Sequence, residues 1–312
     1  MTKTEGHYLR YKLTKLSTKR ACRPFENQFK LHNMIKKYSG VIVPAITPFN
    51  ADLSIDTLAV ANLMKRFAAN GLHPLVLGTT GESPLINTEK SIQVVQTAVA
   101  NRGEGQLIYA GLVGNQLDEM IDRGNRYIAL GADVVVATLP SYYILTPDQM
   151  ERFYTTLADQ VNGPVMMYNI KATTQMSIPV EVVDRLSNHP NIAGLKDSER
   201  DEERMLGFCK QYRERPDFSY FCGWGARSAG SLEAGADGIV PSTGNLVPEM
   251  YGELYKAALE GRWDDCKHWQ AETDKVAVLY QKDCTLGESL KKLKTMMKAN
   301  GWCTDTMMPP LY

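Results

Sequence analysis

Short apolar runs alternate with longer amphipathic stretches along most of the chain. The apolar runs are almost wholly hydrophobic, which is typical of strands buried on both faces of a parallel sheet. Turn residues separate these runs from the stretches that follow them. Eight strands are predicted, over residues 40–49, 74–78, 107–113, 133–138, 164–169, 192–196, 218–223 and 238–242.

Each predicted strand is followed by a stretch in which apolar residues have the spacing of an α-helix. These helices are expected over residues 54–70 (with Ser54 as N-cap), 88–101, 117–130, 147–160, 179–188, 199–214, 226–234 and 248–260. Consecutive strand–helix units of this kind predict an α/β fold, a (β/α)8 TIM barrel with additional C-terminal helices. An open, doubly wound sheet is the alternative, although such a sheet rarely needs so many regular units.

Three segments follow from this pattern. Residues 39–260 form the predicted barrel, and residues 261–312 form a C-terminal helical appendage with helices over 262–281 and 287–300. The appendage is expected either to pack under the barrel or to contact another subunit. Residues 1–38 form a basic N-terminal extension that is expected to lie outside the fold.

The balance of charge separates the extension from the rest of the chain. The net charge is +0, yet residues 1–39 hold ten of the 35 Lys and Arg residues and only two of the 35 Asp and Glu residues. The remainder is mildly acidic, so we expect no nucleic-acid partner. The extension weakly resembles an organelle transit peptide, and the favoured alternative is that Met34 is the natural start.

Cysteine usage and hydropathy narrow the class of protein further. The six cysteines are scattered and form no zinc or redox motif, which is typical of reduced thiols in a cytoplasmic protein. No apolar run has the length needed to cross a bilayer, so no membrane partner is expected. Metal-ligand spacings and dinucleotide fingerprints are absent from the sequence, so we predict no metal and no cofactor.

Lys196 stands where the sixth predicted strand ends. Burial disfavours an ammonium group, so a lysine in this position has a lowered pKa and can attack a carbonyl carbon. The alternative is a lysine whose chain packs along the strand while its amine reaches solvent. The choice depends on what stands at the ends of the other strands, because a barrel carries its active site there.

Several of these strand ends carry hydroxyl groups or glycine turns. A Gly-Thr-Thr-Gly-Glu-Ser turn at residues 78–83 follows the second strand, and its free N–H groups and hydroxyls suit a carboxylate. Tyr168 ends the fifth strand, and a phenol there can relay protons to a carbonyl oxygen. The alternatives are a simple glycine-rich turn and a packing tyrosine. Together these groups indicate Schiff-base chemistry on a 2-oxo acid, with no metal required.

With these residues in view, the chain resembles the dihydrodipicolinate synthase / N-acetylneuraminate lyase family of class I, pyruvate-dependent aldolases. The resemblance covers about Met34 to Leu311. Its marks are residues 40–49, the turn at 78–82, Pro140 with Tyr142 and Tyr143, Tyr168 with Asn169, Gly194 to Asp197, residues 238–245 and the closing Pro309, Pro310 and Leu311.

The resemblance implies roles for single residues. Lys196 would form the Schiff base, Tyr168 would be the general acid and base, and Thr79 would share in proton transfer. Tyr142 would be a relay tyrosine lent to the neighbouring subunit of a tight dimer. The implied substrate-binding residues are Thr79, Thr80, Gly81, Tyr143, Thr173, Val240 and Ser242. Family members are commonly homo-oligomers, built as dimers of dimers.

Departures from the family pattern bear on the second substrate. Thr173 stands where lysine-pathway synthases carry an arginine, so a bidentate clamp for a second carboxylate is missing. Lys171 occupies the motif's proline position, and the turn at 223–225 lacks an acidic pair. We therefore expect a class I aldolase or lyase that joins or cleaves pyruvate and an aldehyde, with a 2-oxo-3-deoxy sugar acid or sialic-acid-like substrate.

Three alternatives remain open at this point. The first is a 4-hydroxy-tetrahydrodipicolinate synthase, which joins pyruvate to aspartate semialdehyde. The second is a hydro-lyase of the same family, because the same imine can expel a hydroxyl. The third is a non-catalytic paralogue that only binds a 2-oxo acid.

Overall fold

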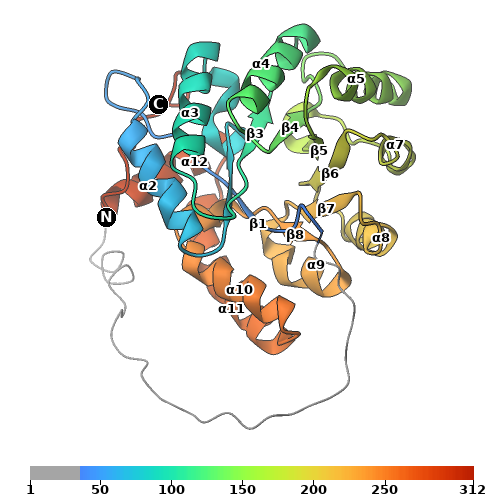
Figure 1. Cartoon of the computed structure of the whole chain (residues 1–312). Coiled ribbons are helices and arrows are strands. Elements are labelled where there is room, and N and C mark those ends of the chain that lie inside the picture. Colours follow the sequence, from blue (N-terminus) through green and yellow to red (C-terminus); the bar gives the residue numbers. More distant parts are fainter. Residues whose placement is uncertain (1–35) are drawn as a thin grey trace. The chain divides into compact units, whose positions relative to one another are not determined.

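The computed structural model describes residues 36–312 and shows eight parallel strands closed into a barrel (Figure 1). The strands follow one another around the barrel in chain order, and β1 closes it by pairing with β8. The strands are β1 (Gly40–Pro44), β2 (His73–Val76), β3 (Tyr109–Leu112), β4 (Val134–Thr138), β5 (Val165–Asn169), β6 (Ile192–Asp197), β7 (Ser219–Cys222) and β8 (Gly238–Ile239). The (β/α)8 prediction is confirmed.

Helices surround this barrel and connect its strands (Figure 1). They are α2 (Thr57–Ala68), α3 (Thr88–Ala100), α4 (Leu117–Ala129), α5 (Pro147–Gln160), α6 (Lys171–Thr174), α7 (Val180–Leu186), α8 (Glu202–Tyr212), α9 (Ser228–Ala234) and α10 (Pro248–Leu259). The additional C-terminal helices are α11 (Trp263–Gln281) and α12 (Leu286–Ala299). Four 3-10 turns follow strands: η1 (Thr79–Gly81), η2 (Ser83–Leu85), η3 (Gly225–Arg227) and η4 (Ser242–Asn245).

Capping residues explain why one helix start was predicted correctly and another was not. Thr146 and Gln149 form a reciprocal capping box, and α5 begins at the predicted residue. The first helix is capped by Asp56, whose carboxylate accepts from the Ala59 N–H, and not by Ser54. Ser54 instead hydrogen-bonds to Asp52 within the preceding turn. The prediction for Ser54 was therefore wrong by two positions.

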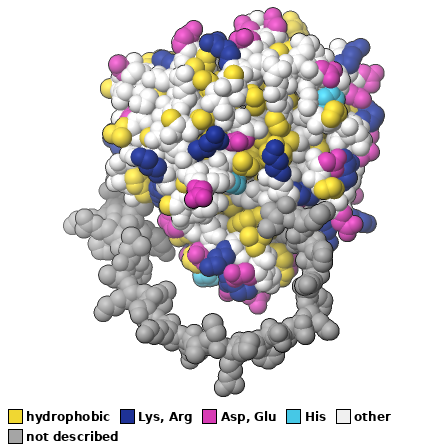
Figure 2. Space-filling model, in the orientation of Figure 1, with side chains coloured by type: hydrophobic (Ala, Val, Ile, Leu, Met, Phe, Trp, Pro, Cys, Tyr) yellow, Lys and Arg dark blue, Asp and Glu magenta, His cyan; other side chains and the backbone are white. Residues whose placement is uncertain are grey.

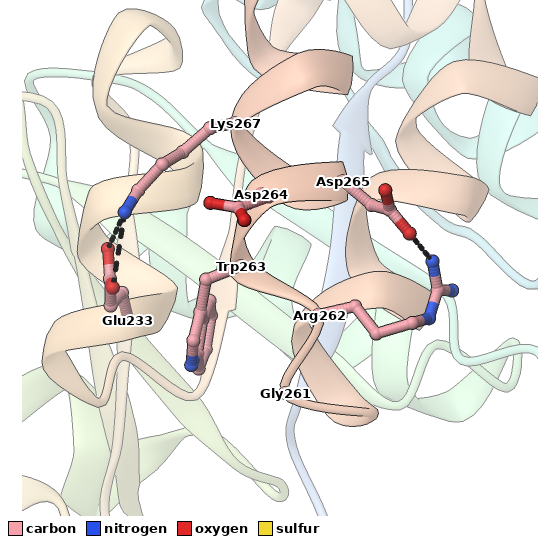
Figure 3. Close-up of a pocket in the computed structure, with 7 residues that line it drawn as sticks. All are labelled: Glu233, Gly261, Arg262, Trp263, Asp264, Asp265 and Lys267. Carbon is pink, nitrogen blue, oxygen red and sulfur yellow. Dashed lines mark hydrogen bonds and ion pairs between the residues drawn. The ribbon is translucent and has the colours of Figure 1, made fainter.

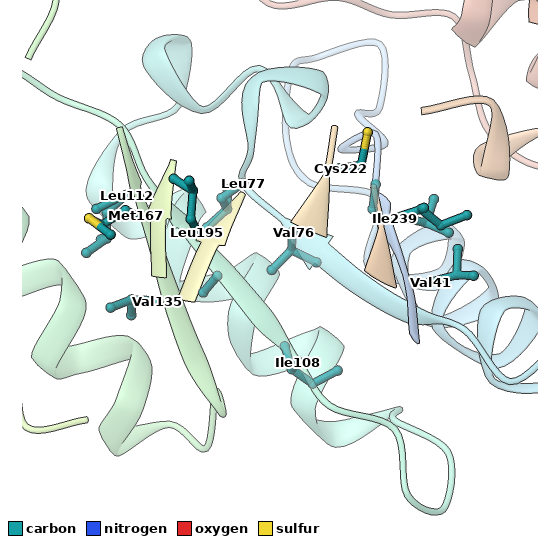
Figure 4. Close-up of a cluster of buried hydrophobic side chains, with 14 of the residues drawn as sticks. Val41, Val76, Leu77, Ile108, Leu112, Val135, Met167, Leu195, Cys222 and Ile239 are labelled. Atoms are coloured by element: carbon teal, nitrogen blue, oxygen red, sulfur yellow. The ribbon is translucent and has the colours of Figure 1, made fainter. Parts of the chain in front are cut away.

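The core has two layers because neighbouring residues on a strand point to opposite faces. On β4, Val134 and Val136 belong to a cluster inside the barrel, whereas Val135 and Ala137 pack outward against the helices. Figure 4 shows part of this outer cluster, with Val135 and other strand side chains directed away from the barrel interior. The inner cluster also holds Tyr168, so the ring of this tyrosine lies among barrel-filling side chains.

An irregularity between β5 and β6 decides which way Lys196 points. Val165 pairs with Ile192, but Met166 pairs with Gly194, so Ala193 is an extra residue on β6. A Cβ on Gly194 would lie 2.3 Å from the Ser219 carbonyl oxygen, so only glycine fits there. Beyond the irregularity, Lys196 pairs directly with Tyr168.

The N-terminal boundary of the fold lies earlier than residue 39. Lys36 is buried, and its amine donates to the carbonyl oxygens of Tyr212 (2.7 Å) and Phe218 (2.9 Å) and to Asp237 Oδ2 (2.8 Å). Tyr38 is also buried. The prediction that residues 1–38 lie outside the fold is therefore wrong for 36–38, and residues 1–35 lie outside the described part of the chain.

Replacing Lys36 by Met is expected to destabilise the barrel by about 3 kcal/mol, because it leaves buried acceptors without a donor. Burial already raises the pKa of Asp237, and the Lys36 amine opposes that rise. Urea unfolding of Lys36→Met beside Lys37→Met measures the effect, since Lys37 is exposed. Equal midpoints for the two variants would contradict the structural role of Lys36.

The charge on the surface and the apolarity of the helices bear on the kinds of partner. On the face drawn in Figure 2, basic and acidic side chains are interspersed and not gathered into one basic patch. Among residues 36–312, none of the helices combines the length and apolarity that a membrane span requires. Cytoplasmic location stays a prediction.

Candidate active site

A pocket of about 710 Å³ opens at the carboxyl ends of the strands. Strands β5, β6 and the turns after β2, β7 and β8 contribute to its walls, and helices α11 and α12 complete it. Six of the residues predicted from the sequence line it: Thr79, Thr80, Tyr168, Lys196, Val240 and Ser242.

Lys196 lies at the bottom of this pocket with 3% of its surface exposed. Its Nζ lies 3.6 Å from the centre of the Tyr168 ring. In residues 36–312 no carboxylate forms an ion pair with this amine. Burial lowers the pKa of Lys196, and the neighbouring Tyr168 only partly opposes this effect. The amine is thus set up to be a nucleophile, and it does not reach bulk solvent.

Tyr168 links Lys196 to the turn after β2. Its hydroxyl lies 3.5 Å from Thr79 Oγ1. Burial alone raises the pKa of Tyr168, but the positive charge of Lys196 and hydrogen bonds from Thr79 and Ser198 outweigh burial and lower it. Three strand ends therefore bring a threonine, a phenol and an amine together, as the sequence predicted.

The turn that carries Thr79 and Thr80 is held by the segment that follows β1. Thr47 Oγ1 donates to the Gly81 carbonyl oxygen at 2.8 Å. A Cβ on Gly81 would lie 3.0 Å from the Ala45 carbonyl oxygen, so glycine allows this close packing. Gly81 is buried and does not line the pocket. In the structure Gly81 contributes to the shape of the turn, and its role as a substrate contact stays a prediction.

Three further predicted residues do not line the pocket of their own chain. Tyr142 and Tyr143 are 77% and 74% exposed on the loop between β4 and α5. Their rings contact each other edge to face. Thr173 lies exposed on α6, and its hydroxyl bonds to the Ile170 carbonyl oxygen. Their roles in substrate binding stay predictions.

The C-terminal appendage supplies pocket residues that the sequence did not reveal. Tyr280 on α11 is buried, and its hydroxyl lies 2.8 Å from Ser242 Oγ and 3.0 Å from Thr243 Oγ1. Gln281 Nε2 donates to the same hydroxyl at 2.7 Å. The appendage therefore lies at the mouth of the barrel and not under it. Nothing in the spacing of α11 indicated this position.

A charged network at one wall of the pocket fixes the ends of β5 and β6. Asn169 Nδ2 donates to Asp197 Oδ1 and to Glu199 Oε2, both at 2.9 Å. Arg204 Nε donates to Asp197 Oδ2 at 2.6 Å. Because Asn169 and Asp197 directly follow Tyr168 and Lys196, this network holds the two strand ends together. The acidic residue directly after Lys196 was the available signal for it.

A second hollow lies where α10 leads into α11 (Figure 3). Four of its charged side chains form two ion pairs, Lys267 with Glu233 and Arg262 with Asp265. None of the predicted site residues lines it. Within residues 36–312, no group of His, Cys, Asp and Glu is arranged to hold a metal ion.

Known proteins with similar sequences identify the family of this chain. The model of the dihydrodipicolinate synthetase family matches residues 37–312. A 4-hydroxy-tetrahydrodipicolinate synthase of Laribacter hongkongensis is 33% identical over 72% of this chain and 76% of its own length. The Probable 2-dehydro-3-deoxy-D-pentonate aldolase YjhH of Escherichia coli is 29% identical over 73% and 76%.

Solved structures of dihydrodipicolinate synthases also match this chain. Dihydrodipicolinate synthase from Aquifex aeolicus superimposes with a TM-score of 0.81 at 28% identity, covering 88% of this chain and 92% of the other. The family model and the fold agree. The chain therefore belongs to the dihydrodipicolinate synthetase family, and it is a carbon–carbon lyase built on a TIM barrel.

Proposed function

We propose that Lys196 forms an imine with pyruvate and that this imine is the intermediate of an aldol cleavage or condensation. The observation that carries the proposal is the buried Lys196 amine, 3.6 Å from the Tyr168 ring and without a carboxylate partner in the part of the chain that the structure describes. A structural lysine at this depth needs a counter-charge, whereas a nucleophile needs its absence.

The steps follow from the groups in the pocket. The Lys196 amine attacks the carbonyl carbon of the 2-oxo acid, and the carbonyl oxygen leaves as water after protonation. In the cleavage direction the imine accepts the electrons of the C3–C4 bond, and the C4 hydroxyl loses its proton as the aldehyde departs. Protonation of the resulting enamine and hydrolysis of the imine then release pyruvate.

Tyr168 and the threonines have separate tasks in this scheme. The Tyr168 hydroxyl delivers and removes the protons of imine formation, and Thr79, 3.5 Å away, connects it to the turn. Thr79 and Thr80 hold the carboxylate of the 2-oxo acid, and the backbone of Val240 contacts it. Each of these residues lines the pocket.

The side of the pocket formed by η4, α11 and α12 favours a hydroxylated aldehyde. Ser242, Gln281, Ser289 and Asp274 line it with donors and acceptors suited to hydroxyl groups. The residue at the position of the synthase arginine, Thr173, does not line the pocket. This combination supports a 2-oxo-3-deoxy sugar acid or a sialic-acid-like compound, and the relative named a pentonate aldolase has a substrate of that class.

A 4-hydroxy-tetrahydrodipicolinate synthase is the second candidate. Lys171 and Arg200 both line the pocket, and they could meet the carboxylate of aspartate semialdehyde. Lys171 is already paired with Glu199 at 3.4 Å, which weakens its pull on a substrate. A hydro-lyase would use the same imine. A binding protein without turnover would have no use for an amine buried without a carboxylate partner among residues 36–312.

The deciding experiment combines trapping with a substrate screen. Incubation with pyruvate and borohydride is expected to add a reduced pyruvate adduct at Lys196, read by peptide mass. Release of pyruvate from 2-oxo-3-deoxy sugar acids or N-acetylneuraminate is expected to exceed condensation with aspartate semialdehyde. Absence of the adduct would refute the imine, and efficient condensation with aspartate semialdehyde would select the synthase.

Tyr142 and Tyr143 support a further part of the proposal, a homo-oligomer built from tight dimers. We expect Tyr142→Phe and Lys196→Met chains, each poorly active alone, to regain activity when mixed under exchange conditions. The reason is that one site of the mixed dimer then has both Lys196 and a partner's tyrosine. An assay of the mixture before and after subunit exchange measures this, and no recovery would place Tyr142 outside the site.

A further inference from the structure

Glu82 and Lys294 form a buried ion pair between distant parts of the chain. Their side chains are 0% and 1% exposed, and 212 residues separate them in sequence. Glu82 Oε2 also accepts from the Met308 N–H at 2.7 Å, and Lys294 Nζ also donates to the Thr306 carbonyl oxygen at 2.9 Å. The pair therefore ties helix α12 and the C-terminal segment to the turn after β2.

The turn held in this way is the one that carries the threonines of the pocket. Glu82 directly follows η1, and its N–H donates to the Thr79 carbonyl oxygen at 3.3 Å. Its backbone adopts a left-handed conformation, with φ at 56°, which residues other than glycine rarely adopt. A left-handed residue of this kind persists only when its surroundings hold it, and such residues cluster at functional sites.

Stability alone is a weak explanation for the pair. Two charges buried together lose much of their solvation, and apolar residues of similar size often replace such pairs without loss of stability. Burial lowers the pKa of Lys294, and Glu82 counteracts this. An apolar pair could not replace the two hydrogen bonds that fix the Glu82 carboxylate. These are donated by the Lys294 amine and the Met308 N–H, and their geometry is directional.

We propose that Glu82 and Lys294 are positioning residues, and that their ion pair holds Thr79 and Thr80 in the orientation that binds the substrate carboxylate. The C-terminal appendage thereby sets the affinity of the site for its 2-oxo acid. This inference rests on the proposed function, in which the two threonines hold that carboxylate.

The test compares two carbonyl probes in borohydride trapping at Lys196: pyruvate, and hydroxyacetone, which lacks the carboxylate. In Glu82→Gln and Lys294→Met, the half-saturating pyruvate concentration is expected to rise about tenfold, while trapping of hydroxyacetone is unchanged. Lys298→Met is the matched control on the same helix, because Lys298 forms only an exposed pair with Asp305. It is expected to behave as wild type.

Two further variants keep the test decisive if a single one folds poorly. The double variant Glu82→Gln/Lys294→Met has no uncompensated charge. It is expected to raise the half-saturating pyruvate concentration by no more than the larger of the two single variants does. Glu82→Asp keeps the charge but shortens the side chain. It is also expected to raise the half-saturating concentration of pyruvate while trapping of hydroxyacetone stays unchanged. Unchanged pyruvate trapping, or equal losses for both probes, would overturn the inference. Failure of the wild type to trap pyruvate would instead overturn the proposed function.

Discussion

Lys196→Met is expected to lower the aldolase rate by about four orders of magnitude or more and to remove the borohydride adduct, because no other group can form the imine. Methionine has nearly the same length, so the barrel interior stays filled. The measurement is the steady-state rate together with intact mass after trapping. Lys210→Met, an exposed lysine on α8, is the control and is expected to retain the wild-type rate.

The same substitution is expected to stabilise the fold at neutral pH. The pKa of Lys196 is lowered from its ordinary 10.5 by burial, so the unfolded chain binds a proton that the folded chain resists. This difference makes wild-type stability rise with pH until the unfolded lysine itself loses its proton. The gain from Lys196→Met is therefore largest at low pH and shrinks as pH approaches 10.5.

Thermal unfolding of the wild type and of Lys196→Met between pH 6 and pH 10 tests this pH dependence. The Tm of Lys196→Met is expected to exceed that of the wild type by roughly 2 °C at pH 6. A lower Tm for Lys196→Met at every pH would show that the amine stabilises the fold. The structural interpretation of Lys196, in which its chain merely packs along the strand end, would then be preferred over the nucleophile.

Tyr168→Phe is expected to reduce kcat by about 10²- to 10³-fold while the borohydride adduct still forms, because a positioned acid–base group contributes that much. The ring stays in the inner cluster, so the fold is retained. Tyr154→Phe is the matched control, since it removes another buried phenol hydroxyl, one that bonds to the Ala137 carbonyl oxygen and lies outside the pocket. That variant is expected to lose stability and not kcat.

The pH dependence of trapping gives Tyr168→Phe a second readout. Tyr168 raises the pKa of Lys196 against the effect of burial, so its loss lowers that pKa further. Because the neutral amine is the reactive form, the rise of trapping rate with pH is expected to move to lower pH in Tyr168→Phe. A shift to higher pH, or a kcat equal to that of wild type, would exclude Tyr168 as the proton-transfer group.

The sequence sufficed for the barrel and for the centre of the site. Eight buried strands read as apolar runs, because both faces of a parallel strand are covered, and α5 began where its capping box stands. Because a barrel carries its active site at the carboxyl ends of its strands, the sequence alone predicts that Lys196, Tyr168 and Thr79 lie close together. The short helix α6 was missed because its four residues are too few to show a periodicity.

Contacts between segments far apart in sequence were decided only by the tertiary structure. The irregularity at Ala193 directs Lys196 inward, the buried Lys36 moves the start of the fold, and Tyr280 places the appendage at the barrel mouth. Hydrophobic periodicity reports that one face of α11 or α12 is covered, but it does not report by what. The partner of Lys294 lies across the molecule, so the pocket's outer wall and the hold on its carboxylate turn exist only once the chain is folded.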